Sequence, residues 1–305
     1  MSCYPLAEKQ KKRAMKCTRC GFENPDDTRF CGKCGTRLFP PGMMPVSQTI
    51  TFQEYIDELP RGSIFAGRYE VIEQLGKGGM GKVYRVFDKK VEEEVALKLL
   101  SPDIARDEKT IARFRNELKF ARRITHKNVC RMHDLSEEQG APYITMEYVP
   151  GEDLKSLIRR IGKLPLGKAV HIIMQVCEGL AEAHRLGDVH RDLKPQNIMV
   201  DKEGNSHIMD FGIARSVKSE GFTDSGAIVG TPHYMSTEQV EGKKVDHRTD
   251  IYSLGVILFE MLTGQVPFDG DTFLVIALKH KSEPPPDPRK INAQIPSEVS
   301  RTILK

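Results

Sequence analysis

A glycine-rich turn between two predicted strands limits the fold of this chain more than any other feature of its sequence. Strands are expected at residues 69–74 and 83–87, and between them lies the run Gly76-Lys77-Gly78-Gly79-Met80-Gly81. Such a turn lets backbone N–H groups approach a phosphate without obstruction by side chains. The familiar dinucleotide-binding version of the motif opens a helix instead. Because β-branched and aromatic residues follow Gly81, a hairpin is favoured and the dinucleotide-binding fold is excluded.

The next segment contains a lysine and a glutamate that could pair. Lys98 ends the run Val95-Ala96-Leu97-Lys98 on a predicted strand, where a lone lysine more often points to solvent. Glu117 lies in a predicted helix at residues 111–124, whose apolar positions form one stripe: Ile111, Phe114, Leu118, Ala121 and Ile124. If that helix packs on the sheet, the Glu117 carboxylate can reach Lys98 and hold it toward an anionic ligand.

The most informative run is His190-Arg191-Asp192-Leu193-Lys194-Pro195-Gln196-Asn197, which Asp210-Phe211-Gly212 follows. Phosphoryl transfer needs an acceptor for the hydroxyl proton, oxygen ligands for Mg²⁺ and cations along the phosphates. Asp192 can accept the hydroxyl proton, and Asn197 and Asp210 can supply oxygen ligands for Mg²⁺. Lys194 and Lys98 can supply the cations along the phosphates. Chance agreement of all these groups in order and spacing is negligible.

From about Tyr69 to its end the chain resembles the eukaryotic-type serine/threonine protein kinases, especially the bacterial members. The resemblance implies an α+β, bilobal fold. A five-stranded antiparallel small lobe with one main helix would cover about residues 69–146, and a hinge would join it to a mainly helical large lobe reaching residue 305. It also implies ATP with Mg²⁺ or Mn²⁺ as cofactors, protein substrates with serine or threonine hydroxyls, autophosphorylation through self-association, and a role in bacterial signalling.

Matched residue by residue, the resemblance gives each candidate a role. Asp192 would be the catalytic base, Lys194 would stabilise the transferring phosphate, and Asn197 and Asp210 would bind magnesium. Lys98, paired to Glu117, would hold the α- and β-phosphates, and the two residues would lie near each other or be separable by a swing of the helix. The ATP-binding residues would be Leu75, Gly76, Lys77, Gly78, Gly79, Met80, Gly81, Val83, Ala96, Lys98, Met146, Glu147, Val149 and Asp210, with the backbone after Met146 reading adenine.

The resemblance also predicts how the large lobe supports this site. Thr231 would contact Asp192 and Lys194, and a buried Asp250 would anchor the loop that carries them. Arg191 would bind a phosphate placed on one of the hydroxyl residues between Gly212 and Gly230, namely Ser216, Ser219, Thr223 or Ser225. Two departures stand out: Ser236-Thr237-Glu238 replaces the family's alanine-proline-glutamate, and the chain stops at Lys305, before the arginine that Glu238 would pair with. We therefore expect an incomplete large lobe.

Four cysteines in two pairs indicate a second module, with Cys17 and Cys20 in one pair and Cys31 and Cys34 in the other. Two residues between the members of a pair let one tight turn present both sulfurs to a single ion, so four thiolates fit a closed, structural zinc site. Residues 15–38 resemble the zinc ribbons of many prokaryotic proteins; coincidental or redox-active cysteines are the alternative. The remaining cysteines, Cys3, Cys130 and Cys177, are not expected to bind metal. Residues 39–68 are interpreted as a linker.

Composition narrows the classes of function. The net charge of +4 arises within the first 68 residues, and so small an excess makes nucleic acid an unexpected partner. No apolar run is long enough to span a bilayer and the N-terminus has no signal core, so a cytoplasmic location is expected, with a membrane span in a longer gene product left open. Two alternatives to an active kinase stay open: a kinase-shaped binding or scaffold module, and an inactive truncated fragment.

Overall fold

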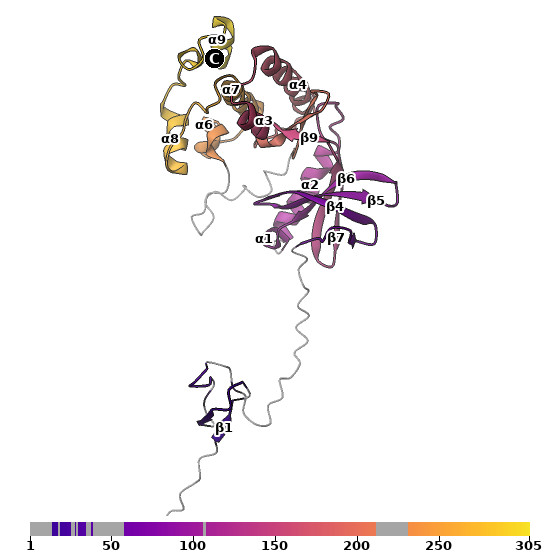
Figure 1. Ribbon diagram of the computed structural model, residues 1–305. Helices are drawn as coiled ribbons and strands as arrows, with labels where there is room; N and C mark the ends of the chain where they lie inside the picture. Colours follow the sequence, from indigo (N-terminus) through magenta and orange to yellow (C-terminus); the bar gives the residue numbers. More distant parts are fainter. Residues whose placement is uncertain are drawn as a thin grey trace, which may run out of the picture. The chain divides into compact units, whose positions relative to one another are not determined.

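The structure, a computed structural model, describes residues 14–17, 19–25, 28, 30–34, 38, 58–105, 108–211 and 231–305. Two units can be distinguished, Met1–Glu54 and Tyr55–Lys305. The first contains a two-stranded antiparallel hairpin, β1 (Ala14–Lys16) with β2 (Glu23–Pro25). The second consists of an antiparallel sheet followed by helices, which is the bilobal arrangement that the sequence predicts (Figure 1).

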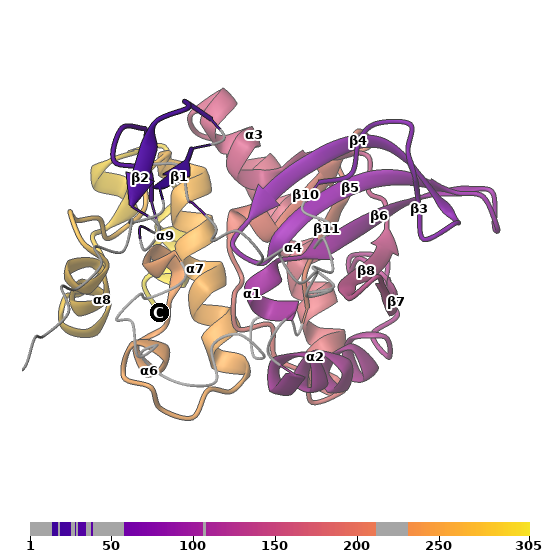
Figure 2. The same cartoon turned by 90° about the horizontal axis from the view of Figure 1, so that it is seen from below.

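A six-stranded antiparallel sheet forms the small lobe, in the order β3-β4-β5-β6-β8-β7 (Figure 2). Its strands are β3 (Ile64–Phe65), β4 (Tyr69–Gly78), β5 (Gly81–Asp88), β6 (Glu93–Leu100), β7 (Met132–Glu138) and β8 (Ala141–Glu147). The sequence predicts five strands, so β3 is an addition. It is a two-residue strand at the edge of the sheet, where Ile64 pairs with Glu70 and Phe65 with Tyr69.

The chain joins this lobe from residue 58 onward, within the segment expected to be a linker. The Leu59 side chain is 7% exposed, and its N–H donates to the Tyr84 hydroxyl at 3.2 Å. The Phe65 ring meets the Tyr143 ring edge-on, with centroids 5.0 Å apart. These residues belong to an apolar cluster on the sheet together with Tyr69, Val71, Val86, Val95, Leu97, Leu99 and Ala141. Residues 58–68 are therefore part of the folded unit.

Two helices follow β6 in the small lobe, α1 (Pro102–Ala105) and α2 (Glu108–Ala121). The helix expected at residues 111–124 thus begins and ends three residues earlier. Phe114, Leu118 and Ala121 are buried, as the apolar stripe predicts. Ile124 is also buried although it lies beyond the end of the helix. The stripe therefore identifies the packed face of α2 correctly but does not locate its last turn.

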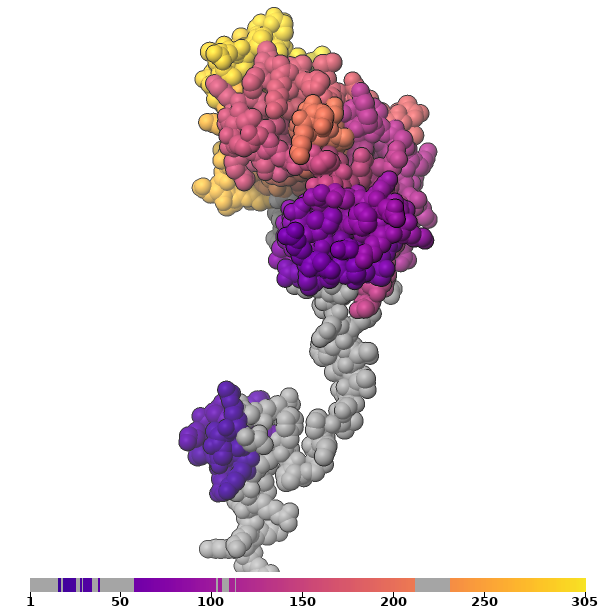
Figure 3. All heavy atoms as spheres, turned by 45° about the vertical axis from the view of Figure 1, so that its right-hand side comes forward, coloured from indigo at the N-terminus to yellow at the C-terminus, as the bar shows by residue number. Residues whose placement is uncertain are grey.

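The large lobe is mainly helical and is built around one buried helix. In the part of this lobe that the structure describes, the helices are α3 (Leu154–Ile161), α4 (Leu166–Arg185), α6 (Thr237–Val240), α7 (His247–Thr263), α8 (Phe273–Ser282) and α9 (Ser297–Ile303). Strands β9 (Gly151–Asp153), β10 (Ile198–Asp201) and β11 (Ser206–Ile208) form a small sheet. Most of α7 is buried, and it packs against both α4 and α9. In Figure 3 the small lobe (purple) adjoins the large lobe (pink to yellow). Within the described residues no helix is long and apolar enough to cross a bilayer.

Shortening the Leu59 side chain should destabilise the larger unit. Leu59→Ala removes a buried side chain at the edge of an apolar cluster, so we expect the free energy of unfolding in urea to fall by about 2 kcal/mol. The control Val91→Ala shortens a side chain that is 53% exposed, and its effect should stay below about 0.5 kcal/mol. Equal effects of the two substitutions would show that residues 58–68 do not stabilise the sheet.

Candidate active site

The glycine-rich turn forms the tip of the hairpin between β4 and β5, where Gly78 pairs with Gly81. Gly81 has φ +139°, and a Cβ built there would lie 1.9 Å from the Leu99 carbonyl oxygen. Only glycine fits that position. Gly76, Gly78 and Gly79 have no atom within 4 Å of a built Cβ, so this side of the turn is open to a ligand. The turn leads into a strand rather than a helix, as the sequence predicts.

Strand register places the expected nucleotide-binding residues of the sheet on one face. Ala96 lies opposite Met146 on β8, and Lys98 lies opposite Val83 on β5. Residues directly opposite each other in an antiparallel pair project to the same face, as do residues two apart in one strand. Ala96, Lys98, Met146 and Val83 therefore share a face. Leu75 lies on β4, near the tip of the hairpin, and its side chain is exposed.

The chain leaves β8 through Glu147 and then passes to the large lobe. The Glu147 N–H donates to the Arg131 carbonyl at 2.9 Å, and its carboxylate accepts from the Arg131 N–H at 3.1 Å. The Cys130 thiol donates to the Glu147 carbonyl at 3.5 Å. Burial raises the pKa of the Cys130 thiol, so it keeps its proton at neutral pH. The backbone at Glu147 is thus held by contacts with Cys130 and Arg131.

A short loop, His190 to Asn197, brings the predicted catalytic groups together. The Lys194 ammonium lies 2.6 Å from Asp192 Oδ2. Pro195 begins the 3₁₀ turn Pro195–Asn197, where a missing N–H costs little. That turn brings Asn197 back to Asp192, and its Nδ2 donates to the Asp192 carbonyl at 2.8 Å. A carboxylate, an ammonium and an amide therefore converge within eight residues of sequence.

A buried carboxylate on α7 holds the backbone just before Asp192. Asp250 is fully buried, and it accepts from the His190 N–H at 2.8 Å and from the Arg191 N–H at 2.9 Å. His184 Nε2 lies 2.8 Å from the same carboxylate. Arg191 has a left-handed φ of +66°, which is unfavourable for a residue with a side chain. Asp250 therefore anchors this strained part of the loop, as predicted.

Asp210 meets Lys98 beside this loop. Its Oδ2 lies 2.7 Å from the Lys98 ammonium, and its backbone has φ +57°. The preceding residue is fixed to the loop, because the Met209 N–H donates to the Asn197 carbonyl at 2.8 Å and the Met209 carbonyl contacts His190 Nε2 at 2.8 Å. The structure thus gathers the groups expected from the sequence into one region: Lys98, Asp192, Lys194, Asn197 and Asp210.

In the smaller unit four sulfur atoms meet. They belong to Cys17, Cys20, Cys31 and Cys34, and all lie within 4.8 Å of one another. Two of the sulfur pairs are 3.6 Å apart. Tetrahedral zinc with Zn–S distances of about 2.3 Å would space its sulfurs by about 3.8 Å, so the donor set fits the ion. The buried Asn24 supports the cluster by donating to the Phe22 carbonyl and accepting from the Gly32 N–H, each at 2.9 Å.

Comparison with known proteins identifies the family. Residues 69–304 match the family model described as the protein kinase domain. This chain belongs to the protein kinase family. The match covers both lobes and includes every catalytic candidate named above. Residues 16–38 match a zinc-ribbon domain, in agreement with the cluster of four sulfurs.

The similar proteins include bacterial kinases. The serine/threonine-protein kinase PrkC of Bacillus subtilis is 41% identical over 244 residues, which cover 80% of this chain and 38% of the relative. The serine/threonine-protein kinase pkn3 of Myxococcus xanthus is 42% identical over 255 residues, which cover 80% of this chain and 47% of the relative. The chain spans less than half the length of these curated relatives. The crystal structure of the Mycobacterium tuberculosis PknI kinase domain matches with a TM-score of 0.62 and 29% identity, over 81% of this chain and 91% of that one.

Glu117 of the kinase domain lies beside the segment that leads into Asp192. Together with Phe120 and the residues from Gly187 to Arg191, it lines a cavity of about 110 Å³. The ion pair that the structure shows for Lys98 is with Asp210. Burial raises the pKa of Asp188, another residue of this cavity. The pairing of Lys98 with Glu117 stays a prediction.

Sequence reasoning missed a buried ion pair in the large lobe. The Glu260 carboxylate of α7 lies 2.5 Å from the Lys155 ammonium of α3 and accepts from the Tyr234 hydroxyl at 2.6 Å. Burial and the charge of Glu260 raise the pKa of Tyr234, so the phenol stays protonated and donates. The signal available in the sequence was a charged residue inside the apolar run from Gly255 to Leu262. This pair ties α3 and the segment after Thr231 to α7.

Glu238 also has a partner that the sequence did not indicate. It accepts a hydrogen bond from the Thr249 hydroxyl of α7 at 2.5 Å. Thr231 is the first residue that the structure describes after residue 211, and the contacts expected of it with Asp192 and Lys194 stay a prediction. The candidate phosphorylation sites lie at residues 212–230, outside the described residues.

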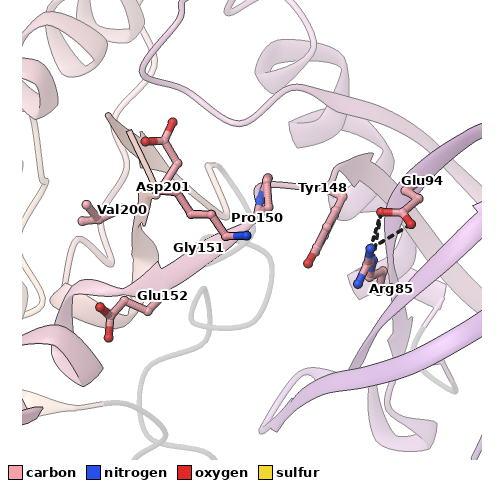
Figure 4. Close-up of a pocket in the computed structure, with 9 residues that line it drawn as sticks. Arg85, Glu94, Tyr148, Pro150, Gly151, Glu152, Val200 and Asp201 are labelled. Carbon is pink, nitrogen blue, oxygen red and sulfur yellow. Dashed lines mark hydrogen bonds and ion pairs between the residues drawn. The ribbon is translucent and has the colours of Figure 1, made fainter. Parts of the chain in front are cut away.

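An open cavity of about 670 Å³ lies beside the connection between the lobes (Figure 4). It is lined by Arg85, Glu94, Tyr148, Pro150, Gly151, Glu152, Val200, Asp201 and Lys202. Tyr148 belongs to the segment after Met146 whose backbone is expected to read adenine, and the other lining residues are outside the expected ATP-binding set. Arg85 pairs with Glu94 at 2.7 Å, and its guanidinium lies 4.8 Å from the centroid of the Tyr148 ring. The cavity wall therefore links β5 and β6 to the interlobe connection.

Replacing the anchoring carboxylate of the kinase domain should disrupt the loop. Asp250→Asn keeps the shape but puts an amide NH₂ where one of the acceptors stood, so a buried donor loses its partner. We expect the free energy of unfolding to fall by about 2 to 3 kcal/mol in urea titrations. Asp246→Asn is the matched control, because Asp246 is an exposed N-cap of the same helix and asparagine caps equally well. A stability loss no larger than that of the control would contradict the anchoring role.

Proposed function

We propose that this kinase domain transfers the γ-phosphoryl group of ATP to serine and threonine hydroxyls of protein substrates. The observation that carries the proposal is the contact between Asp192 and Lys194 at 2.6 Å on a loop held by Asp250. A fixed carboxylate can accept the proton of an incoming hydroxyl, and the adjacent ammonium can offset charge on the transferring group. Relatives named serine/threonine-protein kinases support this choice of acceptor.

The oxygen atoms near the loop fit magnesium, with manganese as the alternative. Asn197 donates its Nδ2 to the Asp192 carbonyl, which leaves Oδ1 as the atom of that amide available to a cation. Asp210 supplies a carboxylate from the neighbouring chain segment. Magnesium prefers oxygen ligands and usually keeps several waters, so one or two protein ligands and the ATP phosphates complete a normal site. When bound, such ions neutralise charge on the phosphates.

ATP itself would lie between the glycine-rich turn and the interlobe connection. The open side of residues 76–81 offers backbone N–H groups to the phosphates, where Lys98 adds a cation. The shared face of Val83, Ala96 and Met146, with Leu75 at its edge, offers apolar surface to adenine. The backbone of Glu147 and Val149 would supply hydrogen bonds to the base.

Activity would require a change in the partners of Lys98. Lys98 is paired with Asp210 in this conformation. In protein kinases, the lysine that binds the phosphates is paired instead with a glutamate on the helix that corresponds to α2. We propose that α2 moves so that Glu117 replaces Asp210, which then becomes available to magnesium. Phosphorylation at Ser216, Ser219, Thr223 or Ser225, by self-association of two chains, is the proposed trigger, with Arg191 as the residue that binds the phosphate.

For the smaller unit we propose a structural zinc ion bound by four cysteines. All four sulfurs would be ligands, which leaves no open coordination position and therefore no hydrolytic chemistry. The buried apolar residues that the structure describes around the cluster are few, Cys17, Cys31 and Leu38. So small a core cannot stabilise a fold by burial alone, and the metal would hold it.

The role of Asp192 can be separated from nucleotide binding. Asp192→Asn should lower the rate of phosphoryl transfer at least about a hundredfold, because the amide cannot accept the proton. ATP affinity should stay nearly unchanged, since the nucleotide contacts lie elsewhere. Asp210→Ala should instead weaken magnesium-dependent ATP binding. Peptide phosphorylation and calorimetric titration with ATP measure the two effects, and wild-type turnover in the Asp192 variant would refute the assignment.

Metal analysis tests the zinc proposal. The reduced, metal-replete chain should contain one zinc per chain, and Cys31→Ser should lower that content and unfold residues 15–38. The matched control is Cys177→Ser, which replaces a cysteine of the kinase domain outside the cluster and should keep the full zinc content. A metal content near zero in the wild type would overturn the proposal. We also expect chelation to leave the melting of the kinase domain largely unchanged.

A further inference from the structure

We infer that Gln239 is a positioning residue for the base Asp192, an inference that rests on the proposed kinase activity. Gln239 belongs to the short helix α6. Its Nε2 donates to the Arg191 carbonyl at 2.7 Å, and its Oε1 accepts from the Ser236 N–H at 3.0 Å. The Arg191 carbonyl is part of the peptide bond that leads into Asp192. One side-chain amide therefore joins the start of α6 to the residue before the base.

Arg191 is a residue that needs support on both sides. Its left-handed φ of +66° is unfavourable for a residue with a Cβ. The Asp250 carboxylate holds its N–H at 2.9 Å, and Gln239 holds its carbonyl at 2.7 Å. These two hydrogen bonds fix the peptide groups on either side of Arg191, including the peptide plane between Arg191 and Asp192. That plane places the backbone of Asp192, from which its carboxylate reaches the Lys194 ammonium, 2.6 Å away.

Gln239 is itself held by a capping box. The Ser236 hydroxyl accepts from the Gln239 N–H at 3.4 Å, while the Gln239 side chain accepts from the Ser236 N–H. Ser236 is fully buried, and its hydroxyl lies 3.3 Å from the hydroxyl of Thr249 on α7. Thr249 directly precedes Asp250 in sequence. The contacts thus form a closed ring from α7 through Ser236 and Gln239 to Arg191, and back through Asp250.

Four variants of the full chain separate positioning from general stability. Gln239→Met keeps the length but removes the donor and the acceptor. Gln239→Glu keeps an acceptor for the Ser236 N–H and loses the donor to Arg191 at neutral pH. Ser236→Ala weakens the cap but leaves the bond from Gln239 to Arg191 in place. Gln294→Glu, at an exposed position, controls for the added charge.

Both Gln239 variants should lower kcat by about tenfold, the effect of one lost buried hydrogen bond on the transition state. The KM for ATP should stay within about twofold, because the proposed nucleotide contacts do not involve α6. Hydrogen–deuterium exchange of the loop at residues 188–194 should become faster in both. Gln294→Glu should keep kcat and loop exchange within about twofold of wild type. Ser236→Ala, which opens the ring at the cap, should change both quantities less than the Gln239 variants do.

Three outcomes would overturn the inference. Unchanged loop exchange in both Gln239 variants would do so, and so would an unchanged kcat. A loss of kcat in Ser236→Ala as large as in Gln239→Met would assign Gln239 a structural role only. Should Gln239→Met fail to fold, Gln239→Glu decides, because it retains the capping contact. A wild-type chain without transfer activity would contradict the proposed function instead, and the exchange measurement would still decide the role of Gln239.

Discussion

The active-site loop depends on one buried carboxylate. Burying the charge of Asp250 would be costly without hydrogen bonds, and His190, Arg191 and His184 provide contacts to it. Because α7 is buried along most of its length, it is a rigid support for a loop that has little regular structure of its own. The candidate catalytic side chains are therefore positioned by this helix. The same helix carries Glu260 and Thr249, through which the segments after Thr231 are attached.

Lys98 has Asp210 as its acidic partner in this conformation, and Glu117 is its partner in the proposed active state. In this conformation Asp210 takes the ammonium, which neutralises the carboxylate proposed to bind magnesium. Glu117 meanwhile lies in the cavity beside Arg191. In the proposed exchange, Glu117 would replace Asp210 beside Lys98, so both carboxylates would change partners together. A concerted change of this kind suits a switch, since partial rearrangement would leave a charge poorly compensated.

Most of the site was predictable because its groups are close in sequence or repeat with the period of a strand. The loop from Asp192 to Asn197 converges over a few residues, and strand parity places Lys98 with Ala96. The contact of Leu59 with the sheet was not predictable, since the apolar residues around it do not recur with the period of a helix or a strand. The sequence left two positions open for Glu117, near Lys98 or separated from it by a swing of its helix, because both are compatible with the same helix sequence. The bond from Gln239 to Arg191 joins distant segments and leaves no local signal.

The presence of Gly81 in a related chain would not by itself indicate nucleotide binding. Any side chain there would overlap the Leu99 carbonyl oxygen, so glycine is required by the packing of the hairpin whether or not a nucleotide ever binds. Gly76, Gly78 and Gly79 face open space and are under no such steric demand. Among descendants of this sequence that had lost phosphotransfer, Gly81 would persist while the other three drifted. The informative glycines for judging whether a related chain is a working enzyme are therefore the unconstrained ones.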